Sequence, residues 1–174
     1  MRTARPDQIN DLLRTFGALT WPDGRQTALD LAAARGWSVR LETRNAVRFT
    51  TNLGTNDDRA RAFVLSDEAT GGTLDKLTVN VSDAVKEAPA ELEKAYTDLC
   101  ALVGTTLGAP VQVDRGTLPR TFWDLENGGR VGFQQLSDIV IMILLSRDAA
   151  DLARDEERLG IDPNRTPGTG HEGL

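Results

Sequence analysis

The chain has 174 residues, of which 40% are hydrophobic and 26% are charged, and its formal net charge at pH 7 is −6. This length favours one domain, and a chain of this size buries about two-thirds of its unfolded surface, so it needs no disulfide or metal to fold. A single cysteine excludes an intramolecular disulfide framework, and a single histidine argues against clustered metal ligands and histidine-dependent catalysis.

The charge balance and the absence of long apolar runs restrict the partners that we expect. No run of about 18 apolar residues is present to span a membrane, and the N-terminus has no apolar signal core, so we expect a cytoplasmic protein. An acidic chain is repelled by nucleic acid and by anionic membranes, and it attracts basic proteins. We therefore expect a protein partner, no nucleic acid and no membrane.

Hydrophobic periodicity predicts two helices and then four strands in the N-terminal half. Pro6 suits the first turn of a helix, and apolar residues then recur at helical spacing up to Gly17. After Gly36 the period changes to two, which is typical of half-buried strands, and short connections between them favour an antiparallel meander. The expected helices are 6–17 and 28–35, and the expected strands are 37–42, 46–51, 62–66 and 77–82.

The C-terminal half predicts a long helix, further strands and a last helix. A broad apolar stripe follows Pro89, Asn127-Gly128-Gly129 is typical of a hairpin turn, and the apolar run 139–145 favours a strand buried on both faces. The other expected elements are a short strand at 111–113, hairpin strands at 121–125 and 130–136, and a charged helix that ends near Gly160. Residues 1–161 are thus expected to form a single α+β domain, and residues 162–174 a disordered tail. The expected fold is an antiparallel sheet of about six to seven strands, with helices packed mainly on one face.

Carboxylates are the abundant chemical groups in the predicted loops and strand ends. Asp57 and Asp58 are adjacent in a polar loop, and Asp124 and Glu126 are expected on one face of a strand because they are two residues apart. Such pairs are able to bind a hard cation or serve as acid and base, but acids at these positions are ordinarily solvated. Cys100 lies on an apolar helix stripe and is expected in the core. We expect no catalytic residue, no metal and no cofactor.

Two adjacent aromatic residues, Phe122 and Trp123, must point to opposite faces of a strand. One of them should therefore lie outside the face that the helices cover. An exposed Trp123 beside Asp124 and Glu126 would suit a protein-binding patch, because tryptophan is frequent among residues that dominate binding energy. The alternative is that a helix covers Trp123.

Two segments carry a resemblance to a known group of proteins. Residues 32–37 (AAARGW) and 121–131 (TFWDLENGGRV), followed by Asp138 and the apolar strand, resemble an uncharacterised family of small actinobacterial α+β proteins over residues 6–150. Such small acidic α+β proteins are similar to immunity proteins that are encoded beside secreted polymorphic toxins. The family offers no established active-site motif to carry over.

The resemblance implies a non-enzymatic immunity protein that occludes the active site of a basic toxin domain. Asp57, Asp58, Asp124 and Glu126 would contact basic residues of the toxin, and Trp123 would be an apolar anchor. The protein is expected to be a monomer or a weak homodimer. Two alternatives stay open: a secretion chaperone that holds an effector segment along a sheet edge, and a small-molecule-binding domain or enzyme that uses paired carboxylates.

Overall fold

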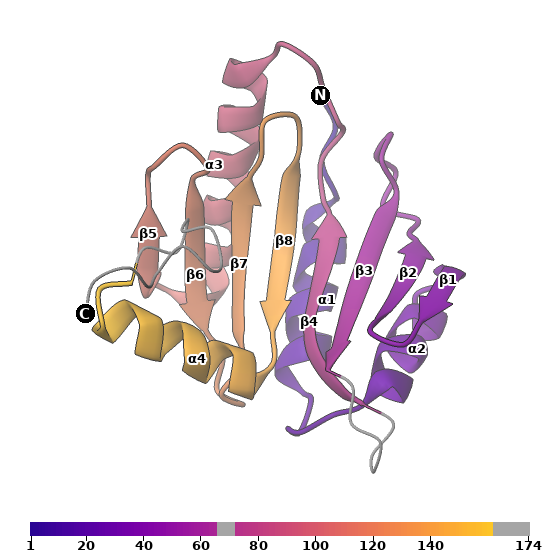
Figure 1. The fold of residues 1–174 in the computed structure, drawn as a ribbon. Helices are drawn as coiled ribbons and strands as arrows, with labels where there is room; N and C mark the ends of the chain where they lie inside the picture. The colour runs from indigo at the N-terminus through magenta and orange to yellow at the C-terminus, as the bar shows by residue number, and fades with distance from the viewer. Residues whose placement is uncertain (66–71, 162–174) are drawn as a thin grey trace, which may run out of the picture.

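The computed structural model describes residues 1–65 and 72–161, and this part of the chain forms four helices and eight strands (Figure 1). All eight strands join one antiparallel sheet in the order β1-β2-β3-β4-β8-β7-β6-β5. The elements are α1 (Pro6–Gly17), α2 (Arg25–Ala34), β1 (Ser38–Thr43), β2 (Ala46–Thr50), β3 (Arg59–Leu65), β4 (Thr73–Asn80), α3 (Pro89–Leu107), β5 (Gln112–Asp114), β6 (Arg120–Asp124), β7 (Arg130–Gln135), β8 (Val140–Leu145) and α4 (Arg147–Arg158).

The predicted α+β class and the antiparallel sheet are confirmed, with eight strands rather than six or seven. The eighth strand is β5 (Gln112–Asp114), at the place of the short strand expected at 111–113, and its three residues carry so little periodicity that the sequence favours it only weakly. The meander β1-β2-β3-β4 is confirmed. The tail that was expected to be disordered, 162–174, lies outside the described residues.

Three helices cover one face of the sheet, and α4 lies across the lower ends of β6, β7 and β8 on the other face (Figure 1). Helix α1 begins at Pro6, as predicted, and buries four apolar residues, Ile9, Leu12, Leu13 and Phe16. Helix α3 contacts β7 and β8, and α2 contacts β1, β2 and β4. The hydrophobic core therefore lies between the sheet and these three helices.

Side chains along the central strands alternate between the helix-covered face and the opposite face. In β2, Val47 and Phe49 are buried while Arg48 between them is exposed. We expected the run 139–145 to be buried on both faces, but only alternate residues of β8 are fully buried. The expectation fails because α4 covers only part of the second face, so that Ile141 is only half-buried and lines a surface hollow.

The hairpin between β6 and β7 is built by the residues that the sequence indicated. Gly128 has a φ of +87°, a conformation that glycine adopts without strain. The Asn127 carboxamide oxygen accepts a hydrogen bond from the Gly129 backbone (3.0 Å), and its nitrogen donates to the carbonyl oxygens of Phe16 and Leu19. The turn is thereby connected to the end of α1.

Candidate functional site

A wide hollow in the described surface lies on the second face of the sheet, where no helix covers β1, β2 and β3 (Figure 1). It has a volume of about 1000 Å³ and is open to solvent. We call it the sheet hollow. Its charged lining residues are Arg40, Arg48, Arg59, Arg61, Asp57, Asp58 and Asp138. Leu41 and Ile141 add apolar surface to its wall.

One end of the sheet hollow is basic. Arg48 of β2 lies directly opposite Arg61 of β3, and Leu41 of β1 lies opposite Arg48. Within residues 1–65 and 72–161, no ion pair joins Arg40, Arg48 or Arg61 to a carboxylate. In the described part of the chain, these side chains therefore carry positive charge that no carboxylate pairs with.

An aromatic ring supports the basic end. The Arg61 guanidinium carbon lies 4.2 Å from the centroid of the Phe63 ring, and the Lys76 ammonium nitrogen lies 4.6 Å from the same centroid. Phe63 and Lys76 are directly opposite each other across β3 and β4. Cations within about 6 Å of a ring are attracted by its negative face, so both side chains are held above the sheet.

The other end of the sheet hollow is acidic. Asp57 forms an ion pair with Arg59, and this hydrogen-bonded pairing lowers the pKa of Asp57, although partial burial opposes the shift and a hydrogen bond from Asn80 adds to it. Asp58 and Asp138 are exposed on the same rim. The hydrogen bond and charge of Asp57 raise the pKa of Arg59, and the charges of Asp138 and Asp58 add to this shift. The hollow is therefore polarised from carboxylates to arginines.

The structure separates the two predicted carboxylate pairs. Asp57 and Asp58 lie at the sheet hollow, between β2 and β3, whereas Asp124 ends β6 on the other half of the sheet. Glu126 was expected to share a strand face with Asp124, but β6 ends at Asp124 and Glu126 lies in the turn. Neither Asp124 nor Glu126 lines the sheet hollow.

The prediction that Trp123 is an exposed anchor is wrong. Trp123 is 2% exposed, and its indole Nε1 donates to the Gly108 carbonyl oxygen at 3.0 Å. It lies on the helix-covered face opposite Val131, with its ring 6.5 Å from that of Phe133. Phe122 does point to the opposite face, as adjacent strand residues must, but it is also buried.

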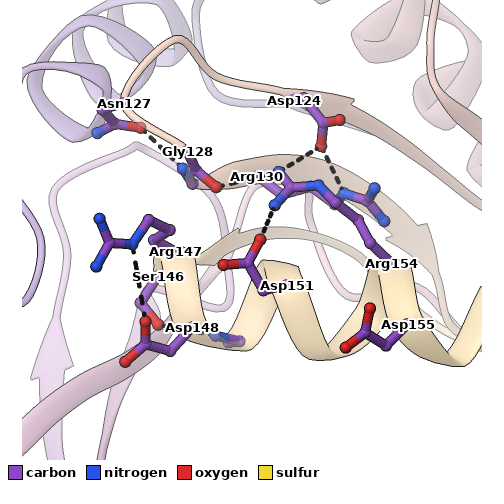
Figure 2. Close-up of polar contacts among 12 residues, drawn as sticks. Asp124, Asn127, Gly128, Arg130, Ser146, Arg147, Asp148, Asp151, Arg154 and Asp155 are labelled. Atoms are coloured by element: carbon purple, nitrogen blue, oxygen red, sulfur yellow. Dashed lines mark hydrogen bonds and ion pairs between the residues drawn. The ribbon is translucent and has the colours of Figure 1, made fainter.

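Asp124 is bound by two arginines that connect α4 to the β6–β7 hairpin (Figure 2). Its Oδ1 accepts from Arg130 Nε at 2.8 Å and from Arg154 of α4 at 2.9 Å. Arg130 is 2% exposed, and it also donates to Glu157 of α4. We call Asp124, Arg130, Arg154 and Glu157 the α4 clamp. These contacts give Asp124 a structural role, which is to hold α4 against the β6–β7 hairpin.

Because of the α4 clamp and the ion pair between Asp57 and Arg59, we expect the protein to lose stability in acid. Burial raises the pKa of Asp124, but hydrogen bonds from Arg154 and Arg130 outweigh it, so the pKa of Asp124, like that of Asp57, is lowered. A lowered folded-state pKa contributes stability that is complete above the unfolded value of about 3.9 and is lost as the pH falls through the folded value. We expect the thermal midpoint to fall below about pH 4. Asp57→Asn and Asp124→Asn should each flatten this decline, and equal slopes in all three proteins would contradict the assignment.

The arginines of the sheet hollow were missed when the sequence was interpreted. Arg40, Arg48 and Arg61 occupy polar positions in segments where polar and apolar residues alternate. Such positions are typical of a solvated sheet face. The alternation of polar and apolar residues was the available signal, but which arginines lie side by side depends on the register between the strands.

The comparison with protein families gives one match, to a family of unknown function (DUF6301), over residues 7–146. The chain belongs to the DUF6301 family. The span that matches DUF6301 contains all eight described strands, α2, α3 and all of α1 except Pro6, and it ends at Ser146, the N-cap of α4. No curated protein and no solved structure matches this DUF6301 chain.

Two further findings concern the described residues of the DUF6301 chain. No helix among them has both the length and the apolar character to cross a membrane. Within residues 1–65 and 72–161 there is also no group of three or more histidine, cysteine or acidic side chains placed to hold a metal ion. Cys100 packs against the core, and burial raises the pKa of its thiol despite opposing hydrogen bonds to Thr121 and Tyr96.

Proposed function

We propose that this DUF6301 protein is a non-enzymatic protein-binding domain, and specifically an immunity protein that occludes the active site of a toxin. The sheet hollow carries the proposal: it is a wide concave surface on strands, with exposed arginines that no described carboxylate neutralises. The resemblance over residues 6–150 supports the immunity role, as does the small acidic α+β fold.

The construction of the sheet hollow suits inhibition by steric blocking. Its floor is formed by β2, β3 and β4, each of which is hydrogen-bonded to neighbours on both sides. Side chains on such a floor lose little backbone freedom on binding, which favours affinity. A toxin whose active site lies against the hollow would be blocked sterically, and this inhibition needs no chemical step.

The composition of the sheet hollow favours a protein over a nucleic acid. Asp57, Asp58 and Asp138 lie on its rim, and they would repel a phosphate backbone that followed the hollow. Phe63 already has cations against its ring, so this face is not available to stack a base. The net charge of −6 also disfavours binding of a nucleic acid.

A secretion chaperone is the second candidate, because β1 is an edge strand that is exposed along its whole length. Val39 and Leu41 are 47% and 45% exposed, and their backbone lies where an added strand would pair. A chaperone of this kind would hold an effector segment on β1 and would leave the activity of the effector intact.

The test is co-expression with the toxin-like product of a neighbouring gene. We expect protection of the cells and a stable complex in size-exclusion chromatography. Arg48→Glu with Arg61→Glu should abolish both, because the variant reverses two charges in the hollow, whereas Arg158→Glu on α4 should preserve both.

The outcomes separate the candidates. An absence of any complex, or a complex without protection, would overturn the immunity proposal. A complex that survives the Arg48 and Arg61 changes but is lost when Val39→Asp is introduced into β1 would establish the chaperone in its place.

A further inference from the structure

One end of the sheet hollow, on which the proposed function rests, is basic although the whole molecule is acidic. Arg40, Arg48, Arg61 and Lys76 gather over β1 to β4 in a chain whose net charge is −6. We call these four residues the basic patch. We infer that the basic patch binds an acidic protein segment, whose aspartate or glutamate side chains pair with Arg48 and Arg61.

The first argument is the juxtaposition of two like charges. Arg48 and Arg61 are directly opposite each other in the β2–β3 register, where side chains are about 5 Å apart at Cβ and like charges destabilise the sheet. An acidic side chain placed between them would remove this repulsion. We expect an anionic partner to relieve this repulsion on binding.

The second argument is the preorganisation of the donors. Arg61 lies over the Phe63 ring at 4.2 Å, which restricts the guanidinium while leaving its edge free to donate. A guanidinium presents parallel N–H groups that match the two oxygens of a carboxylate. Because Arg61 is already positioned, less side-chain freedom is lost when the carboxylate binds.

The third argument is the polarity of the hollow. The carboxylates of Asp57, Asp58 and Asp138 lie at the end away from the basic patch, and Leu41 and Ile141 offer apolar surface in its wall. A segment that combines acidic residues with an apolar residue matches this surface when the acids face β1 to β3. A uniformly anionic polymer would meet repulsion at the acidic end.

The experiment measures fluorescence anisotropy with a labelled peptide of alternating glutamate and leucine at low salt. A peptide of alternating lysine and leucine and a deoxythymidine oligonucleotide serve as the comparison probes. We expect the glutamate peptide to bind most tightly, with an affinity that decreases as salt rises. Arg48→Gln should weaken binding about tenfold, because one charge-assisted hydrogen-bonding partner is lost. Arg158→Gln on α4, which changes the net charge equally, should have no effect.

A second readout separates recognition from a structural role. Arg48→Gln removes the like-charge pair, so the thermal midpoint of the free protein should rise while peptide binding weakens. A lower midpoint, tighter binding of the oligonucleotide, or equal binding by Arg48→Gln and Arg158→Gln would each overturn the inference. Toxin protection that persists in Arg48→Gln together with Arg61→Gln would refute the acidic segment while leaving the immunity function standing.

Discussion

Removing both carboxylates of the α4 clamp, with Asp124→Asn and Glu157→Gln in one chain, is expected to cost about 3–5 kcal/mol of unfolding free energy. Arg130 is 2% exposed, so its charge cannot recover hydration once these two partners are neutral. Helix α4 also loses the contact from Arg154 to Asp124. Urea unfolding at neutral pH, followed by circular dichroism, measures the effect.

A compensating change makes this prediction specific. Adding Arg130→Met to the double variant removes the uncompensated charge and should restore most of the lost stability, because apolar replacement of a whole buried ionic group is often neutral or favourable. Arg158→Gln is the matched control, since Arg158 is 77% exposed and pairs with Asp155 within α4. If the double variant loses less than about 1 kcal/mol, Arg130 is hydrated in solution and the clamp contributes little.

Gly132→Ala in β7 is expected to destabilise the protein by about 3 kcal/mol, at the upper end of overpacking effects. A Cβ at this position would lie 2.3 Å from Cδ1 of Phe122 and 2.4 Å from the carbonyl oxygen of Thr121. Phe122 and Gly132 are directly opposite each other in the register, so the ring rests against the glycine backbone. The ring is able to shift, but the backbone carbonyl is held in the β6–β7 ladder.

Gly104→Ala is the control for this change. Gly104 lies within α3 and a Cβ there would meet no atom within 4 Å, so alanine should stabilise the helix by about 0.5–1 kcal/mol. Opposite signs for the two substitutions, measured by thermal unfolding, are the expected result. A stability of Gly132→Ala equal to that of the wild-type protein would show that β6 and β7 separate easily, and would contradict the packing described here.

Local patterns in the sequence were sufficient for most of the fold. Pro6 marks the start of α1 as predicted, and Asn127-Gly128-Gly129 marks the β6–β7 turn. The predicted start of α2 at residue 28 was less accurate, because Thr27 does not cap the helix: its hydroxyl donates to Asp23 and α2 begins at Arg25. The ends of helices depend on which group a side chain such as Thr27 bonds, and hydrophobic periodicity carries no information about that choice.

The candidate site required tertiary information. The sequence predicts that Phe122 and Trp123 point to opposite faces of the sheet, but only the position of α3 decides which of the two residues faces the core. Likewise, the pairing of Arg48 with Arg61 follows from register, and no local pattern distinguishes one register from the next on a polar face. Asp57 was predicted at the site, while its neutralising partner, Arg59, was not.

The position of β8 has a consequence for biosynthesis. It is translated after the other seven described strands, yet it pairs with β4 on one side and β7 on the other, in the middle of the sheet. Until β8 emerges, the nascent chain holds two separate half-sheets, each with an unpaired edge that invites association with other chains. Completion of the described sheet thus waits for β8 and for a pairing between distant segments, and pairings of that kind slow folding.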